Sequence, residues 1–323
     1  MKSPLASKAD AVVLGLPGLE ADNLLAFLAL LGLLRALETA KPGWLSRVSW
    51  KGPPWTARLH LAEAADESAV AKAAARGVEL LSAKFDVDGR QNVKFDRAEY
   101  RSYALKTRDD PTCAALAAAL TAEVPAKREG GLYAAPLVMM FGQGWQNFLE
   151  RLVSVPRGDI PSRLRKLKQP PNMRDPGKIA EALFTHWARK DDADGFRWDP
   201  EEDQRYAMRF TDPSSEGAAP TVHGANRLAA IGFLSFPAAP GERRMAAVGA
   251  FHDDKGWEFV WPIWSEPLSR VAIEAFLAHP GLMGSDPRAL RVLGVQEVLC
   301  ARRISNGKFM NITRARPTGG TST

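Results

Sequence analysis

An apolar run from Leu24 to Leu37 constrains the fold of this chain more than any other feature of its sequence. Its leucines, alanines and single phenylalanine occupy nearly every angular position of a helix, so no polar stripe remains to face water. The run is about 14 residues long, whereas a helix needs about 20 apolar residues to cross a membrane. We therefore predict a core helix over 22–38 that is covered on most of its sides.

The residues on either side of this run predict the elements that cover it. A strand over 12–16 ends at the turn Pro17-Gly18, and Asp22 or Asn23 stands where a helix N-cap belongs. After the helix, 44–61 alternates between apolar and polar residues around a Lys-Gly-Pro-Pro loop, which is typical of a β-hairpin. Strand, helix and hairpin together indicate an α+β beginning.

The rest of the chain predicts more helices and hairpins. Helical spacing and turn residues give a helical layer over 66–124, a strand over 137–141, a helix over 175–189, a hairpin over 196–210, strands over 244–251 and 257–264, helices over 268–278 and 287–293, and a final hairpin over 298–313. We predict an α+β fold with mixed helical layers and antiparallel sheets or hairpins, in two packed subdomains. They cover 1–212 and 222–316, joined by a linker at 213–221 and followed by a disordered tail at 317–323.

A second apolar segment, 223–236, repeats the shape of the opening helix. Placing Asn226 over Asn23 pairs leucine, alanine and phenylalanine positions of the two segments. Two interpretations remain open, an internal duplication and two independent buried helices.

The composition is that of an ordinary globular protein, with 46% hydrophobic and 25% charged residues. Cys113 and Cys300 are far apart and in no metal-ligand spacing, which is typical of a reducing compartment and speaks against a structural zinc site. The N-terminal residues carry no export signal, so we expect a cytoplasmic protein. We predict no cofactor, no resident metal, no membrane contact and no small-molecule substrate.

Positive charge is concentrated in two segments of the chain. Residues 151–174 carry a net charge of +6 and 301–323 a net charge of +5; since the whole chain is +6, the remainder is net −5. Cations gathered in this way favour a polyanionic partner, because each phosphate that they neutralise releases a condensed counterion. The alternative is a solvated basic face.

The candidate contacts with nucleic acid come from three places. Prolines at 156, 161, 170 and 171 predict that the basic stretch 151–174 is an exposed loop. A Gly-Gln-Gly turn at 142–144 between the predicted strand and a helix beginning at Phe148 could approach an anion, or could be only a tight turn. The predicted contacts are Arg157, Arg163, Arg165, Lys166, Lys168 and Arg174 of the loop, Gln143, Gln146 and Asn147 of the turn, Arg302, Arg303 and Lys308 of the final hairpin, and Arg314 just beyond it.

An acidic stretch at 191–203 offers a competing interpretation. Clustered carboxylates could hold Mg²⁺ for phosphoryl chemistry, which would make the protein a metal-dependent nuclease. These carboxylates lie on one turn-rich segment rather than on separate elements, so we favour a structural role for them. A third interpretation is a scaffold that docks protein partners without contacting nucleic acid.

Several phrases resemble one known family. Leu16-Pro-Gly18, the run Leu25-Ala-Phe-Leu-Ala-Leu-Leu-Gly-Leu-Leu-Arg35 and a strand bearing Trp50 look like the start of the large-subunit-like proteins of type I-U (I-G) CRISPR surveillance complexes. Similar phrases are the loop and helix Gly142–Leu152, Phe196-Arg-Trp-Asp-Pro, Gly224-Ala-Asn-Arg-Leu-Ala, Trp261-Pro-Ile-Trp and Arg302-Arg-Ile. The resemblance implies a non-catalytic subunit of a Cascade-like antiviral complex that contacts guide RNA and/or target DNA, packs with other effector subunits and leaves cleavage to a recruited nuclease.

Overall fold

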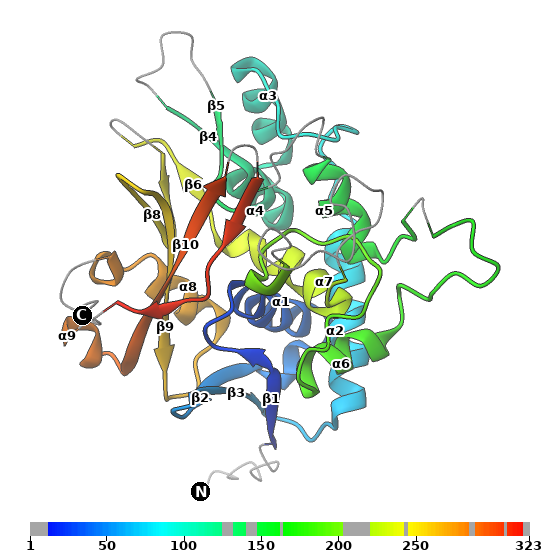
Figure 1. Cartoon of the computed structure of the whole chain (residues 1–323), viewed down its shortest axis with the longest axis vertical. Helices are drawn as coiled ribbons and strands as arrows, with labels where there is room; N and C mark the ends of the chain where they lie inside the picture. The colour runs from blue at the N-terminus through cyan, green and yellow to red at the C-terminus, as the bar shows by residue number, and fades with distance from the viewer. Residues whose placement is uncertain are drawn as a thin grey trace, which may run out of the picture.

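The computed structural model describes residues 12–124, 132–139, 147–161, 164–202, 220–241, 245–283, 288–306 and 309–318. It has the α+β fold predicted from the sequence. Helix α1 (Leu24–Ala40) lies near the middle, with helices on one side and the larger antiparallel sheet on the other (Figure 1).

The central helix α1 matches its prediction closely. The Oδ1 of Asn23 accepts hydrogen bonds from the backbone N–H groups of Leu25 (2.9 Å) and Ala26 (3.4 Å), so Asn23 rather than Asp22 is the N-cap. Every residue from Leu24 to Leu34 is buried, and the expectation of a helix covered on most sides is confirmed.

The N-terminal sheet has the strand order β1-β3-β2, all antiparallel. Its strands are β1 (Val12–Glu20), β2 (Arg47–Lys51) and β3 (Thr56–Leu61), which confirms the predicted hairpin. The prediction of a turn at Pro17-Gly18 is wrong, because β1 continues to Glu20 with irregular pairing after Leu16. Gly18 packs directly against a helix, and a Cβ there would lie 2.1 Å from the carbonyl oxygen of Ala182.

The helices form most of the remaining core. Their bounds are α2 (Glu67–Ser82), α3 (Arg97–Thr107), α4 (Pro111–Leu120), α5 (Phe148–Arg157), α6 (Pro176–Phe184), α7 (His223–Gly232), α8 (Arg270–Leu277) and α9 (Arg288–Arg291), with short 3-10 turns η1 (Pro42–Trp44), η2 (Pro200–Glu202), η3 (Phe233–Ser235) and η4 (Pro280–Met283). The predicted helical layer is confirmed as far as Leu120. Beyond it, β4 (Thr121–Glu123) pairs with β5 (Leu132–Ala134).

Four sequence-based expectations fail locally. The helix predicted over 175–189 ends at Phe184, where Thr185 turns extended and the indole N–H of Trp187 donates back to the carbonyl of Ala182 (2.8 Å). Residues 137–139 form a turn and not a strand, and residues 196–199 are not in a strand either. The helix predicted from Phe148 extends to Arg157, so residues 154–157 of the stretch predicted as loop belong to α5. Residues 140–146 and 203–219, which include most of the predicted linker, lie outside the described residues.

The larger antiparallel sheet has the strand order β11-β10-β9-β8-β7-β6. Its strands are β6 (Ala238–Ala239), β7 (Ala246–Ala247), β8 (Ala250–Asp253), β9 (Gly256–Trp264), β10 (Val295–Asn306) and β11 (Phe309–Ile312), and β12 (Arg316–Pro317) also pairs with β10. The predicted C-terminal hairpin is confirmed as β10–β11. Residues 317 and 318, which we expected in a disordered tail, bond to β10, and residues 319–323 lie outside the described part.

Buried residues from both predicted subdomains form one hydrophobic cluster. The indole of Trp261 on β9 stacks on Phe27 of α1 with ring centroids 5.4 Å apart and donates to the carbonyl of Ala21. The backbones of Val48 and Leu268 also pair, with N···O distances of 2.9 and 2.8 Å. The division into 1–212 and 222–316 stays a prediction, since the described halves share their core.

Helix α1 is touched by two other helices at backbone distance. A Cβ on Gly32 would lie 1.8 Å from the carbonyl oxygen of Leu228, and a Cβ on Gly232 would lie 1.9 Å from that of Leu28, so α1 and α7 meet glycine to glycine. A Cβ on Gly77 of α2 would lie 2.0 Å from the carbonyl oxygen of Ala36. Only glycine fits at these contacts, because real Cβ atoms do not come so close to a backbone oxygen.

We expect Gly32→Ala to lower the free energy of unfolding by about 3 kcal/mol or more, because the added methyl group must push α7 away from α1. Urea denaturation measures the change. Gly15→Ala is the matched control, since a Cβ on Gly15 meets nothing within 4 Å and should change stability by about 0.5 kcal/mol at most. An equal effect of the two substitutions would contradict the glycine contact.

Candidate nucleic-acid interface

The segment between α5 and α6 extends outward from the body of the protein (Figure 1). Gly158 ends α5 with a left-handed φ of +66°, and none of the described residues from there to Asp175 lies in a helix or strand. The buried side chain of Leu164 anchors a turn in which the N–H of Leu167 donates to the carbonyl of Leu164 (3.1 Å). The predicted irregular basic loop is therefore present, and we call residues 158–175 the basic loop.

Cationic side chains on the basic loop face solvent. Arg165, Lys166 and Lys168 are exposed, and the Nε of Arg165 donates to the carbonyl of Ile160 (3.0 Å). Arg174 is also exposed and pairs with Asp159 at 3.2 Å. Arg163 lies outside the described residues. The loop thus presents several charges over a short stretch of chain, with Asp159 and Asp175 as its two acids.

The arginines of the C-terminal hairpin are placed differently. Arg302 donates two 2.8 Å hydrogen bonds to the carboxylate of Asp253 and also pairs with Glu258. These contacts raise the pKa of Arg302 and hold the pKa of the Asp253 carboxyl well below its usual range. A phosphate at this position would have to displace two carboxylates of the same chain.

Arg314 and Arg303 have partners within the chain as well. Arg314 pairs with three carboxylates at 2.8 Å each, those of Glu20, Asp22 and Glu201. Arg303 donates to the carbonyl of Pro136 (3.1 Å), and burial lowers its pKa to about 10. Lys308 lies outside the described residues. These three arginines bond to groups of their own chain, whereas the cations of the basic loop face solvent.

The remaining predicted contacts lie on or beside α5. Arg157 donates to the carbonyls of Ser82 (3.1 Å), Ala83 (3.4 Å) and Phe85 (3.1 Å), so it closes the C-terminal end of α2. The amide of Asn147 donates to Glu150. Gln143 and Gln146 lie outside the described residues. Arg157 is therefore a structural residue on α5, although the sequence places it in the basic stretch 151–174.

Two cationic residues near the loop were not among the predicted contacts. Lys178 follows the loop on α6 and pairs with Asp191. Arg227 lies on α7, is only 2% exposed and donates to the carbonyl of Pro156 (3.2 Å). The sequence could have singled out Arg227, because it lies inside the apolar segment 223–236 and charged residues are rarely buried in a helix without a specific reason.

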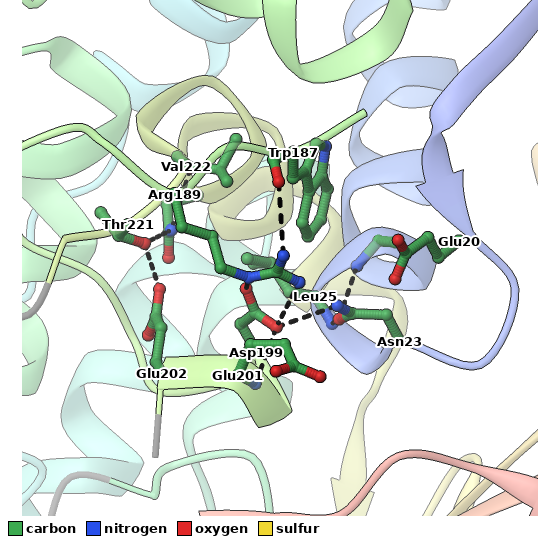
Figure 2. Close-up of polar contacts among 12 residues, drawn as sticks. Glu20, Asn23, Leu25, Trp187, Arg189, Asp199, Glu201, Glu202, Thr221 and Val222 are labelled. Carbon is green, nitrogen blue, oxygen red and sulfur yellow. Dashed lines mark hydrogen bonds and ion pairs between the residues drawn. The ribbon is translucent and has the colours of Figure 1, made fainter. Parts of the chain in front are cut away.

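The acidic stretch is built into the core (Figure 2). Asp199 is fully buried and accepts hydrogen bonds from the amide of Asn23 (2.9 Å), the guanidinium of Arg189 (2.8 and 3.3 Å) and the N–H of Glu201 (3.1 Å). The N–H of Leu25 donates to the carbonyl of Trp198 (3.1 Å). These contacts fasten the N-terminus of α1 to the acidic segment.

Other carboxylates of the stretch have structural partners too. Asp191 accepts from the N–H of His223 (3.0 Å) at the start of α7, and its backbone pairs with that of Thr221. Glu202 accepts from the hydroxyl of Thr221 (Figure 2). Among the described residues, no group of three or more His, Cys, Asp or Glu side chains is placed to hold a metal ion. Asp203 lies outside them, so the nuclease hypothesis finds support in none of the described carboxylates.

Two further observations concern ligand and membrane contacts. A small cleft between Lys178, Trp187, Arg189 and Asp191 has a free volume of about 10 Å³, which is room for roughly one water molecule. No helix in the described ranges is long and apolar enough to cross a membrane.

Removing the charge of Asp199 should destabilise the protein. We expect Asp199→Asn to lower the free energy of unfolding by about 2 to 4 kcal/mol, because Arg189 loses its buried counter-ion and an N–H₂ group faces its guanidinium. Chemical denaturation measures this. Glu201→Gln is the control, since that side chain is 46% exposed and the loss of its charge should cost about 0.5 kcal/mol or less.

Glu202 should make stability depend on pH. Burial, and then the charge of Asp199, raise the pKa of Glu202 to about 7. Between the ordinary glutamate value and about pH 7, the unfolded chain releases this proton while the folded chain keeps it, so stability falls as pH rises. The variant Glu202→Gln has no titrating group at this position. Its stability relative to the natural chain should therefore improve between about pH 5 and pH 7.5. Thermal melts at both values measure this, and a constant difference would contradict it.

Comparison with known proteins assigns no family to this chain. No protein-family model matches it, and no curated protein matches it. The resemblance to CRISPR large-subunit-like proteins therefore stays a prediction from the sequence. Support for a function comes from the contacts, exposure and charge of the residues described above.

Proposed function

We propose that this protein binds the sugar-phosphate backbone of a nucleic acid through the basic loop. The observation that carries the proposal is the exposure of Arg165, Lys166 and Lys168 on a segment that projects from the core. None of these three forms an ion pair with a described carboxylate, whereas Arg302 and Arg314 of the hairpin do.

This contrast matters because of how phosphate binding gains free energy. A cation surrounded by water and mobile ions releases a counterion when it meets a phosphate, which favours binding. A cation already paired with a carboxylate of its own chain must first lose that partner, so the exchange gains little. The basic loop is therefore the best-placed surface for a polyanion among the described residues.

The resemblance to CRISPR proteins extends the proposal to a biological setting. On that basis the protein is a non-catalytic subunit of a Cascade-like effector complex, with guide RNA and/or target DNA and the other effector subunits as partners. The segments that carry the resemblance include 25–35 of α1 and 224–229 of α7, and nearly all of their residues are buried in the core. Phosphate contacts carry no sequence information, so the loop would contribute affinity and register and not sequence reading.

Reversing the loop charges should abolish most of this binding. We expect the triple variant Arg165→Glu, Lys166→Glu, Lys168→Glu to bind a labelled single-stranded oligonucleotide at least tenfold more weakly at about 0.1 M salt. The slope of log K against log salt should flatten by about 2, since each lost contact removes about 0.7 from the slope. Fluorescence anisotropy over a series of salt concentrations measures both quantities.

Two control variants separate a local contact from a general charge effect. Arg108→Glu changes an exposed arginine on the C-cap of α3, and Arg302→Gln removes a paired arginine; neither should flatten the slope. Natural protein that binds neither RNA nor DNA, or binds with no salt dependence, would refute the proposed function. Unchanged binding by the triple variant would refute the role of the loop.

A further inference from the structure

The outer face of the N-terminal sheet carries basic side chains that belong to neither of the two basic segments of the sequence. Side chains alternate between the two faces of a strand. On β3 the residues at 57, 59 and 61 are buried in the core, whereas Arg58 and His60 are partly exposed. Arg58 and His60 therefore lie on the face of the sheet that is turned away from the core.

The pairing of the strands places more cations on this face. In the β2–β3 register, Arg47 stands opposite His60, and Ser49 stands opposite Arg58. Residues directly opposite each other in an antiparallel pair share one face. The hydroxyl of Ser49 lies 2.8 Å from the Nε2 of His60, as a shared face requires. Lys51 is two residues beyond Ser49 and lies on this face too. We call Arg47, Lys51, Arg58 and His60 the basic sheet face.

The cations of the basic sheet face have no counter-ion within the described part of the chain. Arg47 and Lys51 are exposed, and neither they nor Arg58 form an ion pair with a described carboxylate. The three strands carry one acidic residue, Glu20, and its carboxylate pairs with Arg314. The positive charge of the face is therefore left for a ligand to neutralise.

The three cations follow one another along the sheet. Strands rise about 3.3 Å per residue, so Arg47 and Lys51 lie about 13 Å apart along β2, and Arg58 falls midway between them on β3. A cation thus recurs about every 7 Å, which is about twice the phosphate spacing of a stacked nucleic-acid strand.

The neighbouring strand β1 leaves space beside these cations. Gly15 stands opposite Arg58, and a Cβ on Gly15 would meet nothing within 4 Å. A glycine in a strand often marks a place where a ligand approaches the backbone closely. A linear polyanion can therefore come down onto the sheet beside Arg58.

We propose that the basic sheet face is a second contact surface for the phosphates of the bound nucleic acid. None of its described side chains is Phe, Tyr or Trp, so the face offers charge and not a stacking platform for bases. The three strands lie at the lower end of the view in Figure 1, and the basic loop extends to the right. This inference rests on the proposed function for the class of ligand, but it names a separate surface.

Neutralising the face should weaken binding. We expect the triple variant Arg47→Gln, Lys51→Gln, Arg58→Gln to bind a labelled single-stranded oligonucleotide at least tenfold more weakly at about 0.1 M salt. The slope of log K against log salt should flatten by about 2, since each lost phosphate contact removes about 0.7 from it. Fluorescence anisotropy over a series of salt concentrations measures both quantities.

A matched control removes the same charge elsewhere. The triple variant Arg76→Gln, Arg101→Gln, Lys106→Gln changes exposed side chains that are already paired with carboxylates, and it should leave the slope unchanged. Equal flattening by the two triple variants would show an effect of net charge alone and would overturn the basic sheet face.

A variant that removes no cation gives a second test. Gly15→Glu places a carboxylate opposite Arg58 in open space, so the fold should tolerate it, and binding should weaken at least about threefold. Gly15→Gln has nearly the same size without the charge and should bind more tightly than Gly15→Glu. Equal affinity of Gly15→Glu and the natural protein would contradict the proposed contact.

The failure of this inference can be distinguished from the failure of the proposed function. Natural protein without salt-dependent binding refutes both. Weaker binding by the variant of the basic loop, with unchanged binding by the variant of the sheet, overturns the sheet face alone. A sheet variant that loses binding to poly-glutamate but keeps its affinity for the oligonucleotide would assign the face to an acidic protein, and that result also overturns the inference.

Discussion

The glycine-to-glycine contact of α1 with α7 is the constraint on which the rest of the structure depends. Because neither Gly32 nor Gly232 carries a Cβ, the two helix backbones touch, and the leucines around them fill the space on both sides. The contact also explains why α1 has no polar stripe: α7 covers one side, α2 reaches it through Gly77, and Trp261 of the larger sheet stacks on Phe27. A helix covered from so many directions can be apolar all round, which is what its sequence shows.

The same contact gives α7 two tasks. One face is fixed against α1, and the other carries His223 and Arg227, which bond to the two ends of the basic loop. Asp191 accepts from the first N–H of α7, so the acidic segment holds the start of that helix. Both ends of the basic loop are therefore hydrogen-bonded to α7, whose residues are all buried. Its cations are exposed, but the backbone from which they extend is anchored at both ends, and an anchored loop loses less conformational entropy when it binds a ligand than an unattached one would.

Local patterns in the sequence were sufficient for much of the fold. The all-round apolar run predicted α1, alternating residues predicted the β2–β3 and β10–β11 hairpins, and prolines predicted the irregular basic loop. Predictions failed where distant residues decide the outcome. The turn at Pro17-Gly18 is absent because α6, more than 150 residues later, packs on Gly18, and the helix over 175–189 is cut short where Trp187 folds back onto Ala182. No local pattern encodes either contact. The similarity of 223–236 to the opening helix remains open to both interpretations; in the structure the two helices pack against each other, which either origin allows.

The candidate site shows the same limit in electrostatic terms. The net charge of a sequence segment does not show which of its arginines will be paired. In the folded protein some of these arginines form ion pairs with carboxylates and others do not. Arg314 meets Glu20 and Asp22 from the opposite end of the chain, and Arg302 meets Asp253 across two strands, so two of the five C-terminal cations gain carboxylate partners on folding. The basic loop keeps its surplus, because its acids, Asp159 and Asp175, are fewer than its cations, and within the described ranges no carboxylate forms an ion pair with Arg165, Lys166 or Lys168. Since only a cation without a fixed counter-ion gains from meeting a phosphate, the position of the carboxylates, more than that of the arginines, decides where a polyanion can bind.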